Sequence, residues 1–320
     1  MNGSSHGYYN KPIVKPHEWK PEVPAYFWIG GMAGAATVGT VLARIRGTHG
    51  LARLYKRIAL AGMLASPVLL ISDLGVKHRF LNMLRVFKPT SPMSVGSWMV
   101  TALGGMLTVS TVAEALELDV LSTLTEVLAA PLGPLVASYT AVLIANTATP
   151  VWHEAYAELP FIFISSAIGG AGALGVLFAP AEECGAAHRA MILGDIGKLA
   201  GVKLMQRNLG DVLSEPYRKG KAGAMENAAM NLGIAALGLG ILGRRNRAMS
   251  CAAAVMSIAS GVLERFTILQ AGKQSAEDPR YVIEQQRASR ALPDELPQHD
   301  EQTDHGEEAE HRMEHYAEKE

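Results

Sequence analysis

The sequence predicts an all-α integral membrane protein, a bundle of about eight transmembrane helices. Of its 320 residues, 49% are hydrophobic and only 18% are charged, and the apolar residues gather in long charge-free runs. Four runs have the ~20 residues that cross the hydrocarbon core of a bilayer. They are Val23–Ala43, Pro89–Ala113, Val127–Trp152 and Leu159–Ala181.

Three shorter charge-free runs predict further spans. They cover Ile58–Ser72, Asn227–Gly243 and Ala248–Leu263. Each is long enough to cross only if the polar residues at its ends lie near the lipid headgroups or inside the bundle.

The eighth span, Ala190–Leu209, contains Asp195, Lys198 and Lys203. Each of these charges costs ~2.5 to 3.5 kcal/mol at the centre of a membrane helix. Asp195 and Lys198 are three residues apart and share one helix face, so they can neutralise each other against the bundle interior. The alternative is an amphipathic cytoplasmic helix, which would leave a seven-span protein.

Composition divides the chain into three parts. Residues 1–22 form a polar segment without the pattern of a removable signal peptide, and residues 23–274 form the helix bundle. Residues 275–320 form an acidic tail, in which 14 Asp or Glu stand against 5 Lys or Arg. Such a composition predicts disorder.

The histidines and cysteines predict no metal site, haem or iron–sulfur cluster in this chain. Cys184 and Cys251 are the only cysteines and form neither a CxxC nor a CxxCH motif. The histidines fall before the first span, at span ends, in loops or in the tail, so no pair of axial haem ligands lies deep in the helices.

Glycines predict close helix packing in GGMAG (Gly30 and Gly34), in GGAGALG (169–175) and at Gly104 with Gly105. The stretch GLGILG, 238–243, matches the dinucleotide fingerprint GxGxxG. It lies inside an apolar span with no preceding strand, so we interpret it as packing.

Titratable residues of both signs follow the second span: Asp73 is followed by Lys77, His78 and Arg79. Charged groups at a membrane boundary are a functional signal. The structural alternative is that Asp73 pairs with Lys77, four residues on, and anchors the helix end.

The same segment carries a family resemblance. Its pattern DLGxxxRFxNMLxxFxPxSPMSxGSW resembles a signature of the NrfD-like family, the membrane subunit of polysulfide reductase and related complexes. The stretches WKPEVPAYFWIGGMAGA, YTAVLIANTATPVWHEAYAELPFIFISSA and VLERFTILQAGKQSAEDPR are also similar to that family. The resemblance extends from Trp19 to about Arg280 and is weakest over the sixth and seventh spans.

The resemblance implies a quinone-reactive anchor of a respiratory oxidoreductase complex in the inner (cytoplasmic) membrane. Its cofactor would be a quinone, menaquinone or ubiquinone, and it would exchange electrons with a ferredoxin-like iron–sulfur subunit. A catalytic molybdopterin or multihaem subunit would complete the complex. Membrane lipid is a further expected partner, and nucleic acid is not. The alternatives are a passive membrane anchor and a polytopic transporter, although a transporter would often show broken helices in both halves.

Family pockets are built from the first four helices near the surface that faces the partner. That position implies a quinone-binding set of Tyr26, Asp73, His78, Arg79 and Trp98. Asp73 is the predicted catalytic residue, because a desolvated carboxylate can exchange a proton with a quinol. The alternative for Tyr26 and Trp98 is a place in the aromatic belt at the membrane interface.

Further polar residues suggest a proton path. The candidates are Glu114, Glu126, Asp195 and Lys198. The structural alternative is that Glu114 and Glu126 belong to an acidic loop with Glu117 and Asp119.

The basic loops indicate how the protein is oriented in the membrane. The first loop and the loop at Arg244 fall on one side of the membrane, which favours these loops inside and both termini outside.

Overall fold

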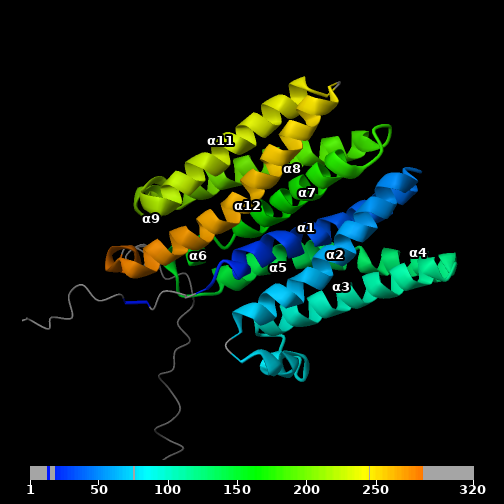
Figure 1. Ribbon diagram of the computed structural model, residues 1–320. Coiled ribbons are helices and arrows are strands. Elements are labelled where there is room, and N and C mark those ends of the chain that lie inside the picture. The colour runs from blue at the N-terminus through cyan, green and yellow to red at the C-terminus, as the bar shows by residue number, and fades with distance from the viewer. Residues whose placement is uncertain (1–12, 15–18, 75, 245, 284–320) are drawn as a thin grey trace, which may run out of the picture. The chain divides into compact units, whose positions relative to one another are not determined.

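The computed structural model describes residues 13–14, 19–74, 76–244 and 246–283. These residues are almost all helical, and Figure 1 shows long helices running side by side. The long helices are α1 (Glu22–Ile45), α2 (His49–Asp73), α3 (Pro92–Ala115), α7 (Leu159–Phe178), α8 (Cys184–Asn208), α11 (Gly220–Leu242) and α12 (Arg247–Glu277). The shorter ones are η1 (Lys77–Leu84), α4 (Asp119–Ala129), α5 (Leu132–Ala145), α6 (Pro150–Glu154), α9 (Gly210–Leu213) and α10 (Glu215–Arg218).

Seven segments of the described chain are long and apolar enough to cross a membrane, with α4 and α5 together forming one of them. The helix α8 is not one of these seven segments; it packs along α7 (Figure 1) and buries Asp195 and Lys198. The predicted all-α membrane bundle of about eight spans is confirmed, and α8 as the eighth span stays a prediction that the burial of this pair supports.

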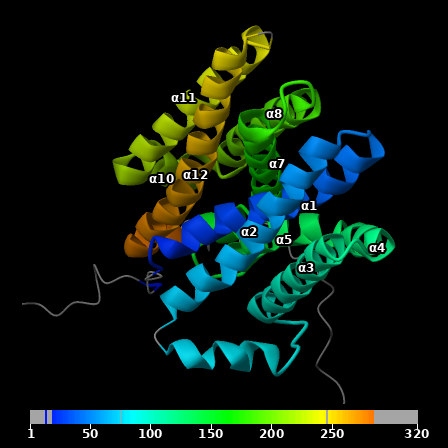
Figure 2. The ribbon, with the colours of Figure 1, turned by 45° about the vertical axis from the view of Figure 1, so that its right-hand side comes forward.

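Two groups of helices make up the bundle, as Figures 1 and 2 show. One contains α1 to α5, and the other contains α7, α8, α11 and α12. Contacts of α1 and α5 with α7, and of α1 with α12, join the two groups. We call the membrane end that holds the start of α1 and the end of α2 the Asp73 end, and the opposite one the Arg44 end.

Close contacts at glycines hold α1 against α5 and α7 against α8. A Cβ placed on Gly34 of α1 would lie 2.4 Å from the carbonyl oxygen of Gly133 on α5, and one on Gly194 of α8 would lie 2.2 Å from the backbone nitrogen of Gly169. Only glycine permits this approach, so the prediction for these glycines is confirmed. It is wrong for Gly105, where a Cβ would meet nothing within 4 Å.

The predicted fourth span, Val127–Trp152, has the wrong bounds. The crossing consists of α4 and α5, which meet at Pro131, and Trp152 belongs to the separate helix α6. Proline has no backbone N–H to donate to the preceding turn, so the helical hydrogen bonding is interrupted there, although Ala130 and Pro131 keep helical dihedral angles. The acidic loop is also wrong, because Glu126 lies in α4 and is buried.

Local capping explains where α3 begins. The Ser91 hydroxyl accepts a hydrogen bond from the Ser94 backbone N–H, and Pro92 occupies the first turn. Ser94 in turn accepts from the Lys88 backbone N–H at 3.0 Å and donates to the Val86 carbonyl at 3.2 Å. The SPMS motif therefore fixes the loop between η1 and α3.

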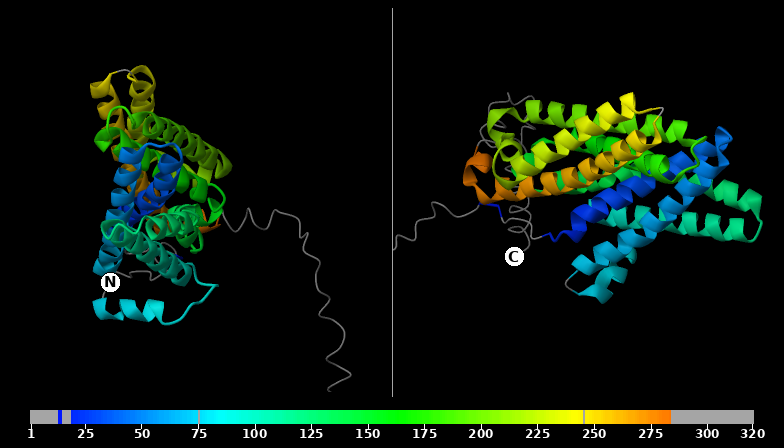
Figure 3. Two further views of the ribbon diagram at one scale, coloured as in Figure 1. Left: turned by 90° about the vertical axis from the view of Figure 1, so that its right-hand side faces the viewer. Right: turned by 45° about the horizontal axis from the view of Figure 1, so that its top comes forward.

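The two basic loops that sequence analysis assigns to one side, after α1 and before α12, both lie at the Arg44 end. Figure 3 shows these helix ends from two further directions. Which membrane side this end faces stays a prediction. The predicted tail lies outside the described residues from 284 onward, and α12 continues to Glu277, past its predicted boundary at 274.

Candidate functional site

The segment before α1 ties several helices together at the Asp73 end. The Lys20 backbone N–H donates to Asp73 Oδ1 over 3.4 Å, and Lys273 Nζ of α12 donates to the Trp19 carbonyl over 2.8 Å. The Trp19 ring stacks on Trp152 of α6 with a centroid separation of 5.6 Å. Asp73 therefore lies where the start of α1 meets the end of α2.

Tyr26 lies inside the bundle, one turn into α1. Its side chain is 1% exposed, and its hydroxyl has no hydrogen-bond partner among the described residues. A Cβ on Gly30 would lie 3.2 Å from the Tyr26 ring and 3.3 Å from the Ser66 hydroxyl of α2, so the ring and Ser66 flank the same glycine. The aromatic-belt alternative is wrong for Tyr26.

Ser66 relates Tyr26 to Asp73. Ser66 and Asp73 are seven residues apart on α2, which is about two helical turns, so they share one face. Ser66 is buried against α1, and this face is therefore the one that packs on Tyr26. The Tyr26 ring and the Ser66 hydroxyl thus lie at the α1–α2 contact, and Asp73 lies about two turns further along the same face of α2.

Asp73 makes no ion pair with Lys77. Helix α2 ends at Asp73, the chain extends at Leu74, and Lys77 begins η1 with an exposed side chain. The ion pairs within the described part of the chain do not join these two residues, so the anchoring alternative is wrong in that form.

The remaining predicted quinone ligands are less closely grouped. The backbones of His78 and Arg79 belong to η1, and their side chains lie outside what the structure describes. Trp98 on α3 is 39% exposed and packs edge to face on Phe87, with ring centroids 6.2 Å apart. Its position fits the predicted belt alternative, at the outer surface of the bundle.

A first cluster of buried charges lies at the Arg44 end. Lys56 of α2 pairs with Glu126 of α4 at 2.9 Å and with Glu114 of α3, and its ammonium also donates to Ser122 Oγ at 3.0 Å. Arg44 Nη2 donates to Glu126 Oε1 at 2.9 Å. Four helices are held together by this network.

A second cluster lies among α8, α11 and α12. Lys198 Nζ donates to Asp195 Oδ1 at 3.0 Å and to Ser260 Oγ at 2.7 Å. A small cavity lies between Lys198, Glu226 and Glu264. Neither carboxylate oxygen of Glu264 has a hydrogen-bond partner among the described residues.

The four candidates for a proton path therefore separate into two pairs. Glu114 and Glu126 belong to the first cluster, and Asp195 and Lys198 belong to the second. Next to Ser260 of the second cluster, a Cβ on Gly261 would lie 2.9 Å from the Trp28 indole nitrogen and 3.1 Å from the Ser166 hydroxyl. Both of these polar atoms are buried and have no partner among the described residues.

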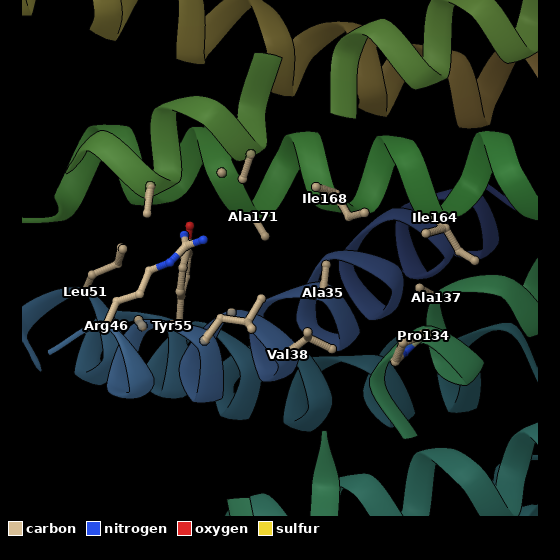
Figure 4. A pocket seen from close by; sticks show the side chains of 16 residues that line it. Ala35, Val38, Arg46, Leu51, Tyr55, Pro134, Ala137, Ile164, Ile168 and Ala171 are labelled. Carbon is tan, nitrogen blue, oxygen red and sulfur yellow. The ribbon is translucent and has the colours of Figure 1, made fainter. Parts of the chain in front are cut away.

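The structure contains one feature at the Arg44 end that the sequence did not indicate. An apolar cavity of about 240 Å³ lies between α1, α2, α5, α7 and α8 (Figure 4). Its only side chains with polar groups are Arg46 and Tyr55. The cavity lies at the opposite membrane end from Asp73.

Sequence reasoning also missed the partner of Trp152. Its indole nitrogen donates to the Ile268 carbonyl at 2.8 Å, and a Cβ on Gly272 of α12 would overlap its ring. Trp152 and Gly272 lie in two separate stretches that resemble the family. That resemblance was the only sequence signal for these two residues, and it does not indicate that they are in contact.

The described residues contain no group of three or more His, Cys, Asp or Glu side chains that could hold a metal ion. The arrangement at the Asp73 end instead offers hydrogen-bonding and proton-exchanging groups in an apolar helix interface.

Comparison with known proteins agrees with this architecture. The family model described as polysulfide reductase, of the NrfD type, matches residues 6–278. A comparison with the curated proteins gives no match. The matched residues include all the described helices of the bundle, and the chain belongs to the polysulfide reductase family of NrfD-like multi-pass membrane proteins.

Proposed function

We propose that this chain is the quinone-reactive membrane subunit of a respiratory oxidoreductase complex, with its quinone bound at the Asp73 end. One observation carries the proposal: the Tyr26 hydroxyl is buried without a hydrogen-bond partner among the described residues, and its ring packs at the α1–α2 contact whose end holds Asp73. A buried hydroxyl loses free energy when it has no hydrogen bond, so a ligand oxygen there would be stabilising. A quinone carbonyl is such an oxygen.

The chemistry assigns separate roles to the two residues. A quinone takes up two electrons and two protons to become a quinol, and the reverse reaction releases them. Tyr26 donates a hydrogen bond to one quinone oxygen, and Asp73 exchanges a proton with the other as a general acid or base. The electrons pass to or from a partner subunit, as membership of this family implies. The quinone is menaquinone or ubiquinone.

The loop between η1 and α3 suits a partner surface. Arg85, Phe87 and Lys88 are all exposed at the Asp73 end, and the serine hydrogen bonds of the SPMS motif hold the loop in place. Exposed apolar and basic side chains together are typical of an interaction site. We propose that an iron–sulfur, ferredoxin-like subunit docks here, close to Asp73, and carries electrons to a catalytic molybdopterin or multihaem subunit.

Trp98, His78 and Arg79 belong to the same proposal. Trp98 lies on the lipid-facing side of α3, where a quinone would approach from the bilayer, and His78 and Arg79 follow Asp73 directly in η1. Proximity in the chain supports a role for His78 and Arg79 at the mouth of the site, and the exposed position of Trp98 supports a role on the path by which a quinone enters. The complex is proposed to lie in the cytoplasmic membrane.

Proton transfer is proposed to use the two buried clusters. The second cluster, with Asp195, Lys198 and Glu264, lies within the bundle, and the first, with Glu114 and Glu126, reaches the Arg44 end. Buried ionisable groups in membrane helices are costly and are characteristic of proton routes. Trp28 and Ser166 offer further polar atoms beside the second cluster, near Gly261.

A photoreactive quinone tests where the ligand binds. The assembled complex is irradiated with an azidoquinone, and the labelled peptides of this chain are mapped by mass spectrometry. We expect labels near Tyr26 and Asp73, displaced by excess unmodified quinone. Displaceable labelling only around the cavity at Arg46 would overturn the assignment, and no displaceable labelling at all would favour a passive membrane anchor.

A further inference from the structure

The cavity at the Arg44 end has the properties of a lipid site. Exposed apolar side chains, Leu42 of α1 and Ile168 of α7, form part of its wall, so it opens on the outer face of the bundle. Its volume of about 240 Å³ is several times the ~30 Å³ occupied by one water molecule. An apolar cavity of this size does not hold ordered water well, and a hydrocarbon chain fits its lining.

The break between α4 and α5 helps to form this cavity. Pro134 and Ala137, in the first turns of α5, line one side of it. Ala35 and Val38 of α1 line another, and small residues of α7 and α8 close its inner wall. The wall is therefore built from helices held at fixed distances by glycine contacts.

Two donor groups lie in this apolar lining. Arg46 caps the C-terminal end of α1, at the membrane boundary, and its guanidinium makes no hydrogen bond or ion pair with any described residue. The Tyr55 hydroxyl makes no hydrogen bond among those residues either. Figure 4 shows both side chains extending from α1 and α2 toward α7 and α8.

We propose that this cavity binds one anionic phospholipid, with an acyl chain against the α1, α5 and α7 side chains and the phosphate at Arg46. An unpaired guanidinium selects an anion, because it forms charge-assisted hydrogen bonds with phosphate oxygens. A quinone is uncharged and leaves that cation without a counterion. The position of Arg46 at a helix end also matches the headgroup level of a bilayer.

The test measures lipid binding to the purified full chain by native mass spectrometry. Phosphatidylglycerol and phosphatidylcholine with identical acyl chains are compared as probes. We expect one phosphatidylglycerol per chain to be retained, with an affinity at least about tenfold above that for phosphatidylcholine. Equal retention of the two lipids would overturn the proposal.

Three variants identify the site. Arg46→Gln should weaken phosphatidylglycerol binding about tenfold, and Ala35→Phe should weaken it by filling the cavity with the charge left in place. Arg53→Gln is the matched control, because Arg53 is also exposed at the Arg44 end and does not line the cavity. It should leave binding unchanged.

Other results would contradict the proposal. An equal loss in Arg46→Gln and Arg53→Gln would mean that the lipid responds only to surface charge. Displacement of phosphatidylglycerol by one equivalent of quinone would assign the cavity to a quinone instead. If Ala35→Phe does not fold, the comparison between Arg46→Gln and Arg53→Gln still tests whether lipid binding depends on Arg46. Both arginine side chains are exposed and neither is part of the buried packing, so both variants should fold.

Discussion

Lys198 donates a 3.0 Å hydrogen bond to Asp195, one turn earlier on α8, and both side chains are 2% exposed. Their mutual neutralisation is what allows this charged helix to join the bundle beside α7. A single unpaired charge at that depth would cost ~2.5 to 3.5 kcal/mol.

Removing one member of this pair should therefore destabilise the bundle. Asp195→Asn removes the carboxylate that is hydrogen-bonded to the buried Lys198 ammonium, and we expect a loss of about 3 kcal/mol in the free energy of unfolding. Thermal unfolding in detergent measures it. The double variant Asp195→Asn with Lys198→Met should recover most of the loss, because the buried ammonium that lost its partner is then absent. A single variant as stable as the wild type would contradict this interpretation of α8.

Substituting alanine for two glycines on different helices tests whether close helix packing requires glycine. Gly34→Ala places a Cβ 2.4 Å from the Gly133 carbonyl oxygen and forces α1 and α5 apart, which we expect to cost about 1 to 3 kcal/mol. Gly105→Ala places a Cβ in open space and should leave stability unchanged or slightly higher. Unfolding of both variants in the same detergent is the measurement. Equal effects would show that the α1–α5 contact is looser than described.

Charge reversal tests the proposed docking loop. Lys88→Glu should weaken binding of the iron–sulfur subunit at low salt, because it replaces an exposed cation beside Phe87 with an anion. The dissociation constant is measured at two ionic strengths, and the effect should diminish at the higher one. Lys221→Glu is the control, an exposed lysine at the Asp73 end but on α11. Unchanged binding in Lys88→Glu would place the partner elsewhere.

The lengths of the charge-free runs were sufficient to predict seven spans, and the i,i+3 spacing of Asp195 and Lys198 was sufficient to predict that both side chains are buried against the bundle. Run length did not reveal the buried network around Lys56. Its partners, Glu114 and Glu126, come from helices more than 50 residues away, so in sequence they resemble an acidic loop. The bounds of the fourth span were missed for the same reason, since a buried Glu126 extends a helix that charge alone would end.

The candidate site was only partly predictable. Tyr26 and Asp73 were predicted from their places near span ends and from the family resemblance, and the structure adds that Tyr26 is buried and that its ring and Ser66 flank Gly30. A sequence cannot distinguish a belt tyrosine from a buried one, because both stand one turn into a span. The apolar cavity was not predictable at all, because its lining comes from five helices spread from Ala35 to Ala190.

The most direct measurement of the central claim is quinone turnover by the assembled Asp73→Asn complex. Asparagine keeps the size of the side chain and part of its hydrogen bonding, including acceptance from the Lys20 backbone N–H, and removes the proton-exchanging group. We expect normal assembly and normal reduction of artificial dyes, with quinone-linked activity lowered by about 10²-fold or more and an altered pH profile. An assembled complex with unchanged quinone kinetics and an unchanged pH profile would contradict a role for Asp73 in quinone chemistry and leave it as a structural link between α1 and α2.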